Sequence, residues 1–419
     1  MADFGAWLRR LFGHPQVTGG PSALPNDQSP TDGPASFADD NDRFALAMYG
    51  HLRQEPGNLS FSPFSIRTAL SMTQAGAVGE TAVQMREALR TSSVDERQHA
   101  GFAAIMQQLN HAGGGEYEMA VANSLWGQDG APLRTEFLDL IARHYGGDAQ
   151  FVDFRRDAEA ARVRINHWVD DKTKQKIRDL IPAGGLDAVS GLVLVNAVYF
   201  KGMWVRPFDR LATRDAPFEV TGGRTVQVPL MRKVETIRYV RGADYQAVDL
   251  IYRGDGVSLF VLLPDRKDGL AALEKRLSLQ MLHDGSRQMV ARPVDLSLPR
   301  FRITWGPANL RGHLIALGMP LAFNPLEANF SMINGHEPPD VDALSLSAVW
   351  HKTFVEVHEE GTEAAAATAV VAPTMSAPLP TPDQIPIFRA DHPFLFAIRD
   401  RKSGAMLFLG RVVDPTVER

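Results

Sequence analysis

Hydrophobic residues in the first half of the chain recur at helical intervals. This spacing between Phe44 and Leu52 predicts that folded structure begins near Asn41. Ser62 followed by Pro63 has the pattern of an N-cap with proline at the first helical position, and it predicts a helix start. Further helices are predicted at Thr81–Leu89 and where one face carries Phe137, Ile141 and Tyr145, or Ile165, Trp168 and Val169.

Strand patterns dominate the second half. Leu192–Phe200 is a continuous apolar run, and Gly254–Gly256 predicts a hairpin that leads into the strand VSLFVLLP. Leucines from Leu310 to Leu317 predict one helix that ends at Gly318. Further strands are predicted at Met119–Leu125, Leu296–Ile303, Phe394–Ile398 and Met406–Val413. Because helices and strands do not alternate as βαβ units, the expected fold class is α+β.

The N-terminal region shows neither the helical nor the strand period of hydrophobic residues. Pro15–Ser36 is rich in Pro, Gly, Ser and Asp and poor in large apolar residues. Such a segment cannot bury enough surface to offset the entropy of ordering. We therefore expect residues 1–36 to be a disordered tail and linker.

One passage near the C-terminus breaks both patterns. It follows the strand-like Phe354–Val357 and reads HEEGTEAAAATAVVAPTMSAPLPTPDQIPIF. Alanine is a poor strand former, and five prolines between Pro373 and Pro386 exclude regular structure. Long irregular loops are uncommon in compact domains unless they have a function. At a period of two, one face would be small enough to enter a packed sheet: Thr362, Ala364, Ala366, Thr368 and Val370. Taken alone, the passage is equally consistent with a segment that can enter the sheet and with a linker or a surface helix.

Composition narrows the classes of function. The 419 residues are 44% hydrophobic and 22% charged, as in soluble globular proteins. A net charge of -5 gives no broad positive field, so nucleic acid is not an expected partner. Without cysteine there are no disulfides, thiolate metal sites or cysteine nucleophiles. The longest nearly apolar run, Gly191–Phe200, is about half of a membrane-spanning helix. The N-terminus does not have the pattern of a signal peptide.

Several passages, in chain order, resemble the serpin family of serine protease inhibitors. They are NLSFSPFSI from Asn58, VLVNAVYFKGMWVRPF from Val193, LSLPRFRI, EANFSMI, LSLSAVWHKTFVEV, EEGTEAAAATA from Glu359, HPFLF and LFLGRVVDP. The resemblance covers roughly Phe37 to Pro415 and is closest to inhibitory, antitrypsin-like members. It implies one domain over residues 37–419, with about eight or nine helices around three β-sheets. An exposed reactive-centre loop would cover about residues 359–387.

The resemblance also implies roles for particular residues. The family's polar cluster beneath the main sheet, called the shutter, corresponds to Ser62, Ser65, Asn196 and His351. The breach, where strand insertion begins, corresponds to Gly202, Trp204 and Phe208. The hinge of the loop corresponds to Glu359, Glu360, Gly361, Thr362, Glu363, Ala364, Ala365, Ala366, Ala367 and Thr368. Counting from Gly361 as in the family, the bond offered for cleavage is Met375-Ser376, with Thr374 and Leu379 as neighbouring alternatives.

The implied activity is suicide inhibition of a serine protease, with no enzymatic activity of the chain itself and no metal or cofactor. The partner would be an elastase-, chymotrypsin- or subtilisin-like protease, because an apolar primary pocket accepts methionine. A non-inhibitory carrier or chaperone, or an inhibitor of cysteine proteases, remains an alternative. The protein is expected to be a monomer. Family resemblance predicts an extracellular location, and the lack of a visible signal peptide keeps the cytoplasm open.

Overall fold

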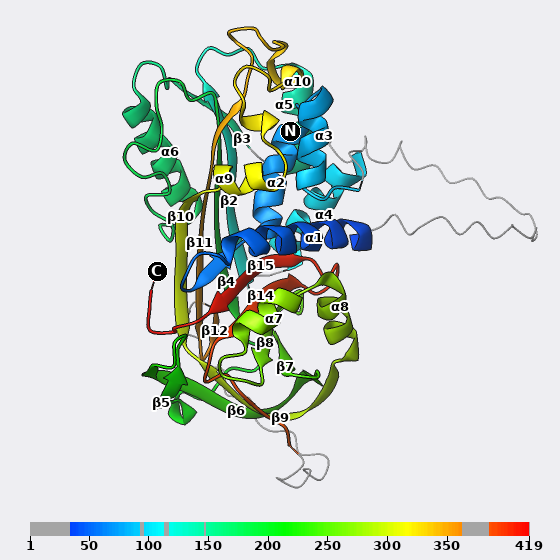
Figure 1. Cartoon of the computed structure of the whole chain (residues 1–419), viewed down its shortest axis with the longest axis vertical. Helices are drawn as coiled ribbons and strands as arrows, with labels where there is room; N and C mark the ends of the chain where they lie inside the picture. Colours follow the sequence, from blue (N-terminus) through cyan, green and yellow to red (C-terminus); the bar gives the residue numbers. More distant parts are fainter. Residues whose placement is uncertain (1–33, 93–95, 113–116, 146–147, 363–384, 419) are drawn as a thin grey trace, which may run out of the picture. The chain divides into compact units, whose positions relative to one another are not determined.

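Two β-sheets run through the part of the chain that the computed structural model describes, residues 34–92, 96–112, 117–145, 148–362 and 385–418 (Figure 1). The six-stranded sheet has the order β10-β11-β12-β4-β2-β3. Its strands are β2 (Tyr117–Gln128), β3 (Asp148–Val152), β4 (Leu192–Met203), β10 (Phe301–Asn309), β11 (Leu346–His358) and β12 (Gly361–Thr362). The nine-stranded sheet has the order β1-β15-β14-β8-β7-β6-β9-β13, with β5 paired to β6.

The nine-stranded sheet combines elements that the family resemblance divides between two sheets. Its long strand β6 pairs with β5, β7 and β9, so hydrogen bonding is continuous across the whole set. The strands are β1 (Leu59–Phe61), β5 (Arg214–Glu219), β6 (Thr225–Arg241), β7 (Tyr245–Ile251), β8 (Val257–Pro264), β9 (Val290–Pro299), β13 (Ile387–Arg389), β14 (Phe394–Asp400) and β15 (Met406–Val412).

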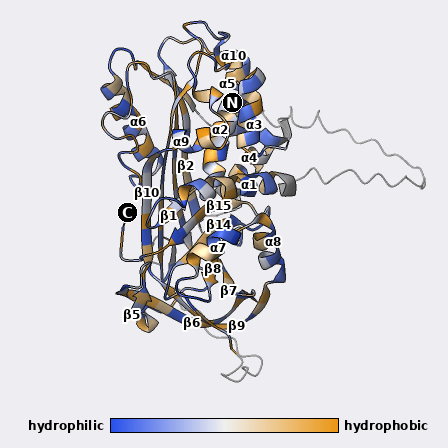
Figure 2. Ribbon diagram, in the orientation of Figure 1, coloured by the Kyte–Doolittle hydropathy of each residue, from blue (hydrophilic) through white to orange (hydrophobic). Residues whose placement is uncertain are grey.

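The described residues contain ten α-helices, and the α+β class is confirmed. They are α1 (Pro34–Leu52), α2 (Pro63–Gln74), α3 (Gly79–Ala88), α4 (Glu96–Ala112), α5 (Thr135–Tyr145), α6 (Ala158–Lys172), α7 (Leu270–Arg276), α8 (Leu279–Gln288), α9 (Arg311–Ala316) and α10 (Ser331–Asn334). Two 3₁₀ helices are Arg210–Ala212 and Leu321–Phe323. Hydrophilic residues gather on α6 and α8 (Figure 2).

Helices cover both faces of the six-stranded sheet (Figure 1). On one face, Leu194 and Val198 of β4 join a large apolar core that includes Phe64 of α2. On the other face, side chains that point the opposite way from β4 and β2 form a second core with Ile165 and Val169 of α6. Because adjacent strand residues face opposite sides, the continuous apolar run in β4 supplies both cores.

The structure confirms three features that were predicted from short stretches of sequence: a helix cap, a hairpin and a helix end. Ser62 is the N-cap of α2, and its side chain accepts a hydrogen bond from the Ser65 backbone N–H. Strands β7 and β8 form the predicted hairpin. Gly318 follows α9 with φ of 109°, a conformation that favours glycine.

The sequence patterns missed α4, α7, α8 and α10. Helix α10 has four residues, and α8 has only Leu282 and Gly285 buried, so neither carries a long apolar period. The predicted domain boundary at residue 37 lies inside α1, which begins at Pro34. The tail predicted over residues 1–36 lies mostly outside the described residues and stays a prediction.

Candidate functional site

The site lies where β4 and β11 separate at one end of the six-stranded sheet. Over most of their length these strands pair directly and in parallel, from Leu346 beside Leu192 to Phe354 beside Tyr199. Beyond that point β12 lies between them. Thr362 pairs antiparallel with both Val357 of β11 and Gly202 of β4. The start of the predicted hinge therefore occupies a gap between two neighbouring strands.

Gly361 is required for this close approach. Its φ is 153°, and an added Cβ would lie 1.9 Å from the Gly202 carbonyl oxygen. No side chain can be accommodated at that distance without moving the β4 backbone. The glycine thus lets the chain enter the sheet directly after the turn at Glu359 and Glu360.

Glu359 anchors the turn. Its carboxylate is 2% exposed and accepts hydrogen bonds from Arg300 at 2.8 and 2.9 Å and from the Thr213 hydroxyl. Burial alone would raise the pKa of Glu359, but hydrogen bonds from Arg300 and Thr213 outweigh it and lower the pKa. The carboxylate therefore remains charged, which strengthens these hydrogen bonds.

The backbone of the same turn is bound by the segment that follows β4. Trp204 and Phe208 donate their backbone N–H groups to the carbonyl oxygens of Glu360 and Glu359, both at 2.8 Å. Trp204 Nε1 also donates to the His358 carbonyl oxygen at 2.9 Å. Two of the predicted breach residues, Trp204 and Phe208, thus bind the hinge directly.

Thr362 is fully buried at the end of β12. Its hydroxyl lies 2.6 Å from the Tyr252 hydroxyl, and the Tyr252 ring stacks on Trp204 with 4.4 Å between ring centroids. An added Cβ on Gly202 would lie 2.8 Å from Tyr252. Gly202 therefore leaves room for the ring that receives Thr362.

The four predicted shutter residues lie together between α2 and the sheet. The Asn196 amide donates to Ser65 Oγ and to Asn123 Oδ1, while Ser65 Oγ itself donates to Asn123 Oδ1 at 2.8 Å. Ser62 Oγ donates to the Leu407 carbonyl oxygen at 2.6 Å. Among the described residues, Asn196 Oδ1 is a buried acceptor without a partner. The cluster is polar, buried and incompletely satisfied.

His351 links α2 to β4 through both ring nitrogens. The Ser62 backbone N–H donates to Nε2 at 3.1 Å, so Nε2 carries no proton, and Nδ1 lies 3.2 Å from the Asn196 carbonyl oxygen and donates to it. Burial lowers the pKa of His351 to about 3, although the hydrogen bond to Asn196 acts in the opposite direction. The imidazole is therefore neutral near neutral pH.

Sequence reasoning missed four residues that complete these contacts: Thr213, Arg300, Tyr252 and Asn123. Asn123 carried a partial signal, since it is a polar residue within a predicted strand. The others contact the hinge from segments distant in sequence, so no local pattern marks them.

The remaining predicted site residues lie outside the described residues. These are Glu363, Ala364, Ala365, Ala366, Ala367 and Thr368 of the hinge, the Met375-Ser376 bond, and the alternatives Thr374 and Leu379. Their roles stay predictions.

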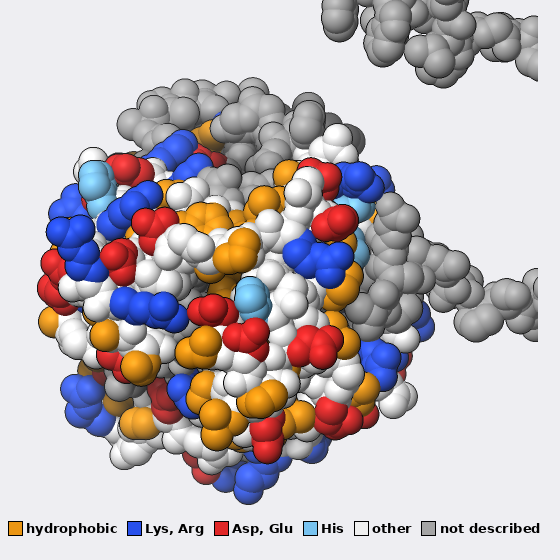
Figure 3. Space-filling model, turned by 90° about the horizontal axis from the view of Figure 1, so that it is seen from above, with side chains coloured by type: hydrophobic (Ala, Val, Ile, Leu, Met, Phe, Trp, Pro, Cys, Tyr) orange, Lys and Arg blue, Asp and Glu red, His pale blue; other side chains and the backbone are white. Residues whose placement is uncertain are grey.

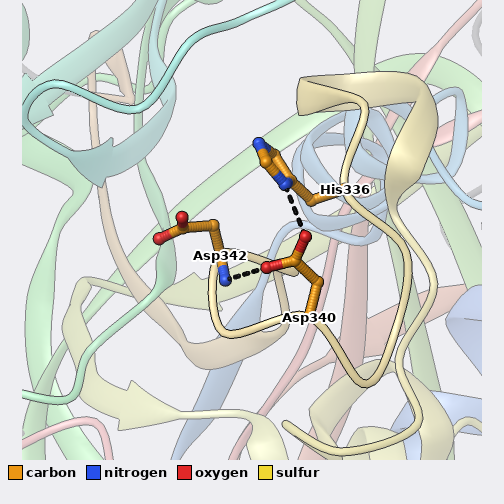
Figure 4. A group of neighbouring side chains, drawn as sticks. All are labelled: His336, Asp340 and Asp342. Atoms are coloured by element: carbon orange, nitrogen blue, oxygen red, sulfur yellow. Dashed lines mark hydrogen bonds and ion pairs between the residues drawn. The ribbon is translucent and has the colours of Figure 1, made fainter.

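Among the described residues, two groups of three histidine and carboxylate side chains have their possible metal-ligand atoms close together, and neither is assigned as a metal site. In the first, His336 Nδ1 lies 2.8 Å from Asp340, which also accepts from the Asp342 backbone N–H (Figure 4). The second is His358 with Glu359 and Glu360, where both carboxylates already pair with arginines. Hydrogen bonds and ion pairs account for both groups. Across the described part of the chain, no helix has the length and apolar character to span a membrane.

Comparisons with known proteins agree on one family. A family model described as serpin (serine protease inhibitor) matches residues 39–415. The chain is 37% identical to the leukocyte elastase inhibitor of Homo sapiens over 385 residues, 90% of this chain and 98% of that protein. It is 38% identical to an uncharacterised serpin-like protein of Thermococcus kodakarensis over 374 residues, 89% of this chain and 84% of that one.

Solved structures show the same similarity. Uncleaved ovalbumin matches with a TM-score of 0.80 and 27% identity, covering 90% of this chain and all of that one. A serpin of the insect Tenebrio molitor, described as highly specific, matches with a TM-score of 0.78 and 30% identity, covering 90% and 98% of the two chains.

The anchor at Glu359 gives a testable prediction. Glu359→Gln should lower the free energy of unfolding by about 1–2 kcal/mol, because Arg300 loses a charged partner but stays partly solvated. Urea unfolding of Glu359→Gln, Arg300→Gln and the double variant measures the coupling free energy between Glu359 and Arg300. Arg266→Gln, which removes an ion pair exposed on both sides, is the control and should change stability by less than about 0.5 kcal/mol. Additive single effects would contradict the coupling.

His351 gives a pH prediction. Its folded pKa of about 3 lies below the ordinary value of 6.5, so its contribution to stability is complete above pH 6.5 and declines as pH falls toward 3. Between pH 7.5 and 5 this should cost about 2 kcal/mol of unfolding free energy. The comparison is with His351→Gln, whose stability should be lower at pH 7.5 but should fall less on acidification. Parallel pH curves for the two proteins would exclude His351 as the titrating group.

Proposed function

Because the chain belongs to the serpin family, we propose that it inhibits serine proteases as a suicide substrate, by inserting its cleaved loop between β4 and β11. The observation that carries this proposal is the position of β12, whose Gly361 and Thr362 already pair with both strands. A family model described as serine protease inhibitor and a relative named as an elastase inhibitor support inhibition rather than enzymatic activity.

The proposed insertion continues the register of β12 through the residues that follow it. Continued in the same direction, the pairing puts Thr368 opposite Asn196 on β4 and His351 on β11. Paired residues share a face, so Thr362, Ala364, Ala366, Thr368 and Val370 would point toward α2. The small side chains of this face fit a core that is already packed. Thr368, the fourth residue of this face, would also bring its hydroxyl to Asn196 Oδ1, which has no hydrogen-bond partner.

Insertion would replace one strand pairing with two. The direct contact of β4 and β11 is parallel, whereas both pairings of β12 are antiparallel. Antiparallel pairs are slightly more stable per residue, and the new strand adds a second ladder of hydrogen bonds. These gains supply the driving force for the proposed change.

The proposed chemistry begins as ordinary proteolysis. The serine oxygen of the target attacks the Met375 carbonyl carbon, an ester forms, and the Ser376 amine leaves with a proton from the protease. Insertion of the freed arm then moves the acylated protease before water hydrolyses the ester. Distorting the oxyanion hole would slow hydrolysis by about 10²- to 10³-fold for each donor lost.

The proposed target has an apolar primary pocket. Methionine is unbranched and apolar, so it fits elastase-, chymotrypsin- or subtilisin-like pockets better than a trypsin-like pocket that contains a carboxylate. The name of the relative that inhibits leukocyte elastase supports this class. By family resemblance we place the target outside the cell, with the cytoplasm as the alternative, and the inhibitor as a monomer.

Incubation with chymotrypsin, elastase, subtilisin and trypsin tests the proposal. We expect a complex that survives denaturing electrophoresis with at least one of the first three proteases, and a released peptide that begins at Ser376. Cleavage without a complex would contradict inhibition and favour a non-inhibitory role. A covalent complex with papain but with none of the serine proteases would favour the cysteine-protease alternative.

Thr362→Arg provides the matched control for insertion. Thr362 is completely buried against Tyr252, so a charged side chain there opposes entry into the sheet. This variant should be cleaved at the same bond but should form little or no complex. Thr362→Ser should behave as the unmodified protein.

Heat stability gives an independent prediction. Cleavage of the loop at Met375-Ser376 should raise the melting temperature well above that of the intact protein, since the inserted strand adds a hydrogen-bonded ladder. Calorimetry of intact and cleaved protein measures the difference. Equal melting temperatures would rule out insertion, and Thr362→Arg should show a smaller rise.

A further inference from the structure

The two ends of the six-stranded sheet have different surroundings. At the end that carries α5 and α10, the described side chains seen in Figure 3 mix hydrophobic, acidic and basic types, so a partner would meet no field of one sign there. At the other end β12 lies between β4 and β11, and Trp204 and Phe208 bind the hinge turn. The residues behind this turn bear most directly on the proposed function.

The segment that binds the hinge turn has no regular structure of its own. Residues 205–209, which follow β4, belong to neither a helix nor a strand. The Val205 N–H ties the start of the segment to the nine-stranded sheet, by donating to the Ile251 carbonyl oxygen at 3.0 Å. Pro207 has no N–H to donate. Side-chain contacts are therefore needed to fix the position of the Phe208 N–H, which binds the hinge turn.

Lys233 of β6 supplies such contacts. Its Nζ donates to the Arg206 carbonyl oxygen at 2.6 Å and lies 4.4 Å from the centroid of the Phe208 ring. A cation over an aromatic face is attracted by the ring, and more strongly where water is excluded. The same ammonium pairs with Glu235 at 2.7 Å, two positions along the same face of β6. One side chain thus contacts the hinge-binding segment on both sides of Pro207.

Both members of this ion pair are largely buried. The Lys233 side chain is 13% exposed and that of Glu235 14%. Hydrogen bonds from a charged donor are strong in such a place, because little water competes for the ammonium. The neighbouring Arg232 differs, since its side chain is 61% exposed and pairs with Asp295. Adjacent strand residues point to opposite faces, so Arg232 is a cation of the same strand that faces away from the hinge-binding segment.

We propose that Lys233 is a positioning residue for loop insertion, an inference that rests on the proposed function. By holding Arg206 and Phe208, it fixes the N–H groups of Trp204 and Phe208 and so fixes the turn Glu359–Glu360, here called the pivot. The freed arm enters the sheet from this pivot. A fixed pivot keeps the arm in the register that β12 has begun, so insertion outruns hydrolysis of the ester. A loose pivot slows insertion, and more ester is hydrolysed.

Substitutions at two adjacent positions separate this role from general stability. Lys233→Met removes the ammonium and keeps an apolar stem, while Lys233→Arg keeps the positive charge. Glu235 retains an ion pair with Arg206 at 3.5 Å, so Lys233→Met leaves no unpaired carboxylate. Arg232→Met removes an exposed cation from the opposite face and is the matched control. Should Lys233→Met fail to fold, Lys233→Gln, which is neutral but polar, takes its place.

Amide hydrogen exchange in the intact proteins tests the pivot without any protease. In Lys233→Met the Trp204 and Phe208 amides should exchange about tenfold faster, the effect of losing one hydrogen bond to a charged group. Lys233→Arg should restore slow exchange, and Arg232→Met should match the unmodified protein. Unchanged exchange of both amides in Lys233→Met would overturn the positioning role.

Titration of chymotrypsin then connects the pivot to inhibition. The number of inhibitor molecules consumed for each protease trapped should rise about threefold or more in Lys233→Met, because slower insertion leaves more ester to hydrolysis. This number should return toward the unmodified value in Lys233→Arg and should not change in Arg232→Met. If Lys233→Met only lowers the melting temperature and consumes no more inhibitor, Lys233 stabilises the fold alone and the inference is wrong.

Failure of this inference and failure of the proposed function give different results. If the unmodified protein forms no complex with any of the proteases tested, the proposed function fails, whatever the exchange rates are. If the unmodified protein forms the complex and Lys233→Met traps chymotrypsin equally well, the proposed function stands and Lys233 has no part in insertion.

Discussion

The parallel pairing of β4 with β11 is the constraint on which the rest of the structure depends. These strands come from distant parts of the chain, and they are hydrogen-bonded directly over most of their length. At one end β12 separates them and offers an antiparallel partner to each. The sheet therefore contains, in one place, both its present arrangement and the beginning of another that is more favourable per residue.

Two groups of contacts stabilise the present arrangement of the sheet. At the open end, Arg300 and Thr213 hold Glu359, and the Tyr252 hydroxyl contacts the Thr362 hydroxyl at the end of the described part of β12. Below it, the polar cluster around Asn196 and His351 holds the strands together and leaves one acceptor unpaired. A buried acceptor without a hydrogen-bond partner, here Asn196 Oδ1, costs free energy. The present arrangement of the sheet therefore keeps this polar group unsatisfied.

Short-range patterns predicted much of this site, and long-range contacts account for what they missed. Ser62 was recognisable because a cap acts on the residues that follow it. Gly361 was recognisable from the family resemblance, and Thr362 from its size and its place in a period of two. Arg300 and Tyr252 were not, because each meets the hinge only after the chain has folded, from 59 and 110 positions away. The merging of two expected sheets into one also depends on β6, whose partners on both sides are set by tertiary structure.

Gly361 also divides the loop into parts that can evolve under different rules. In the proposed insertion, pairing would start at this glycine and give every residue up to the cleaved bond a definite face. Inserting or deleting a single residue there would then exchange the buried and exposed sets. Residues beyond the proposed cleaved bond would not belong to the inserted strand, so their faces would not be fixed by this register. Under the proposed mechanism, substitutions at and after the cleaved bond, including changes in length, could alter the choice of protease without disturbing insertion. The inserted segment and the residues that select the protease could then vary independently. One scaffold could in this way adapt to different proteases over evolutionary time.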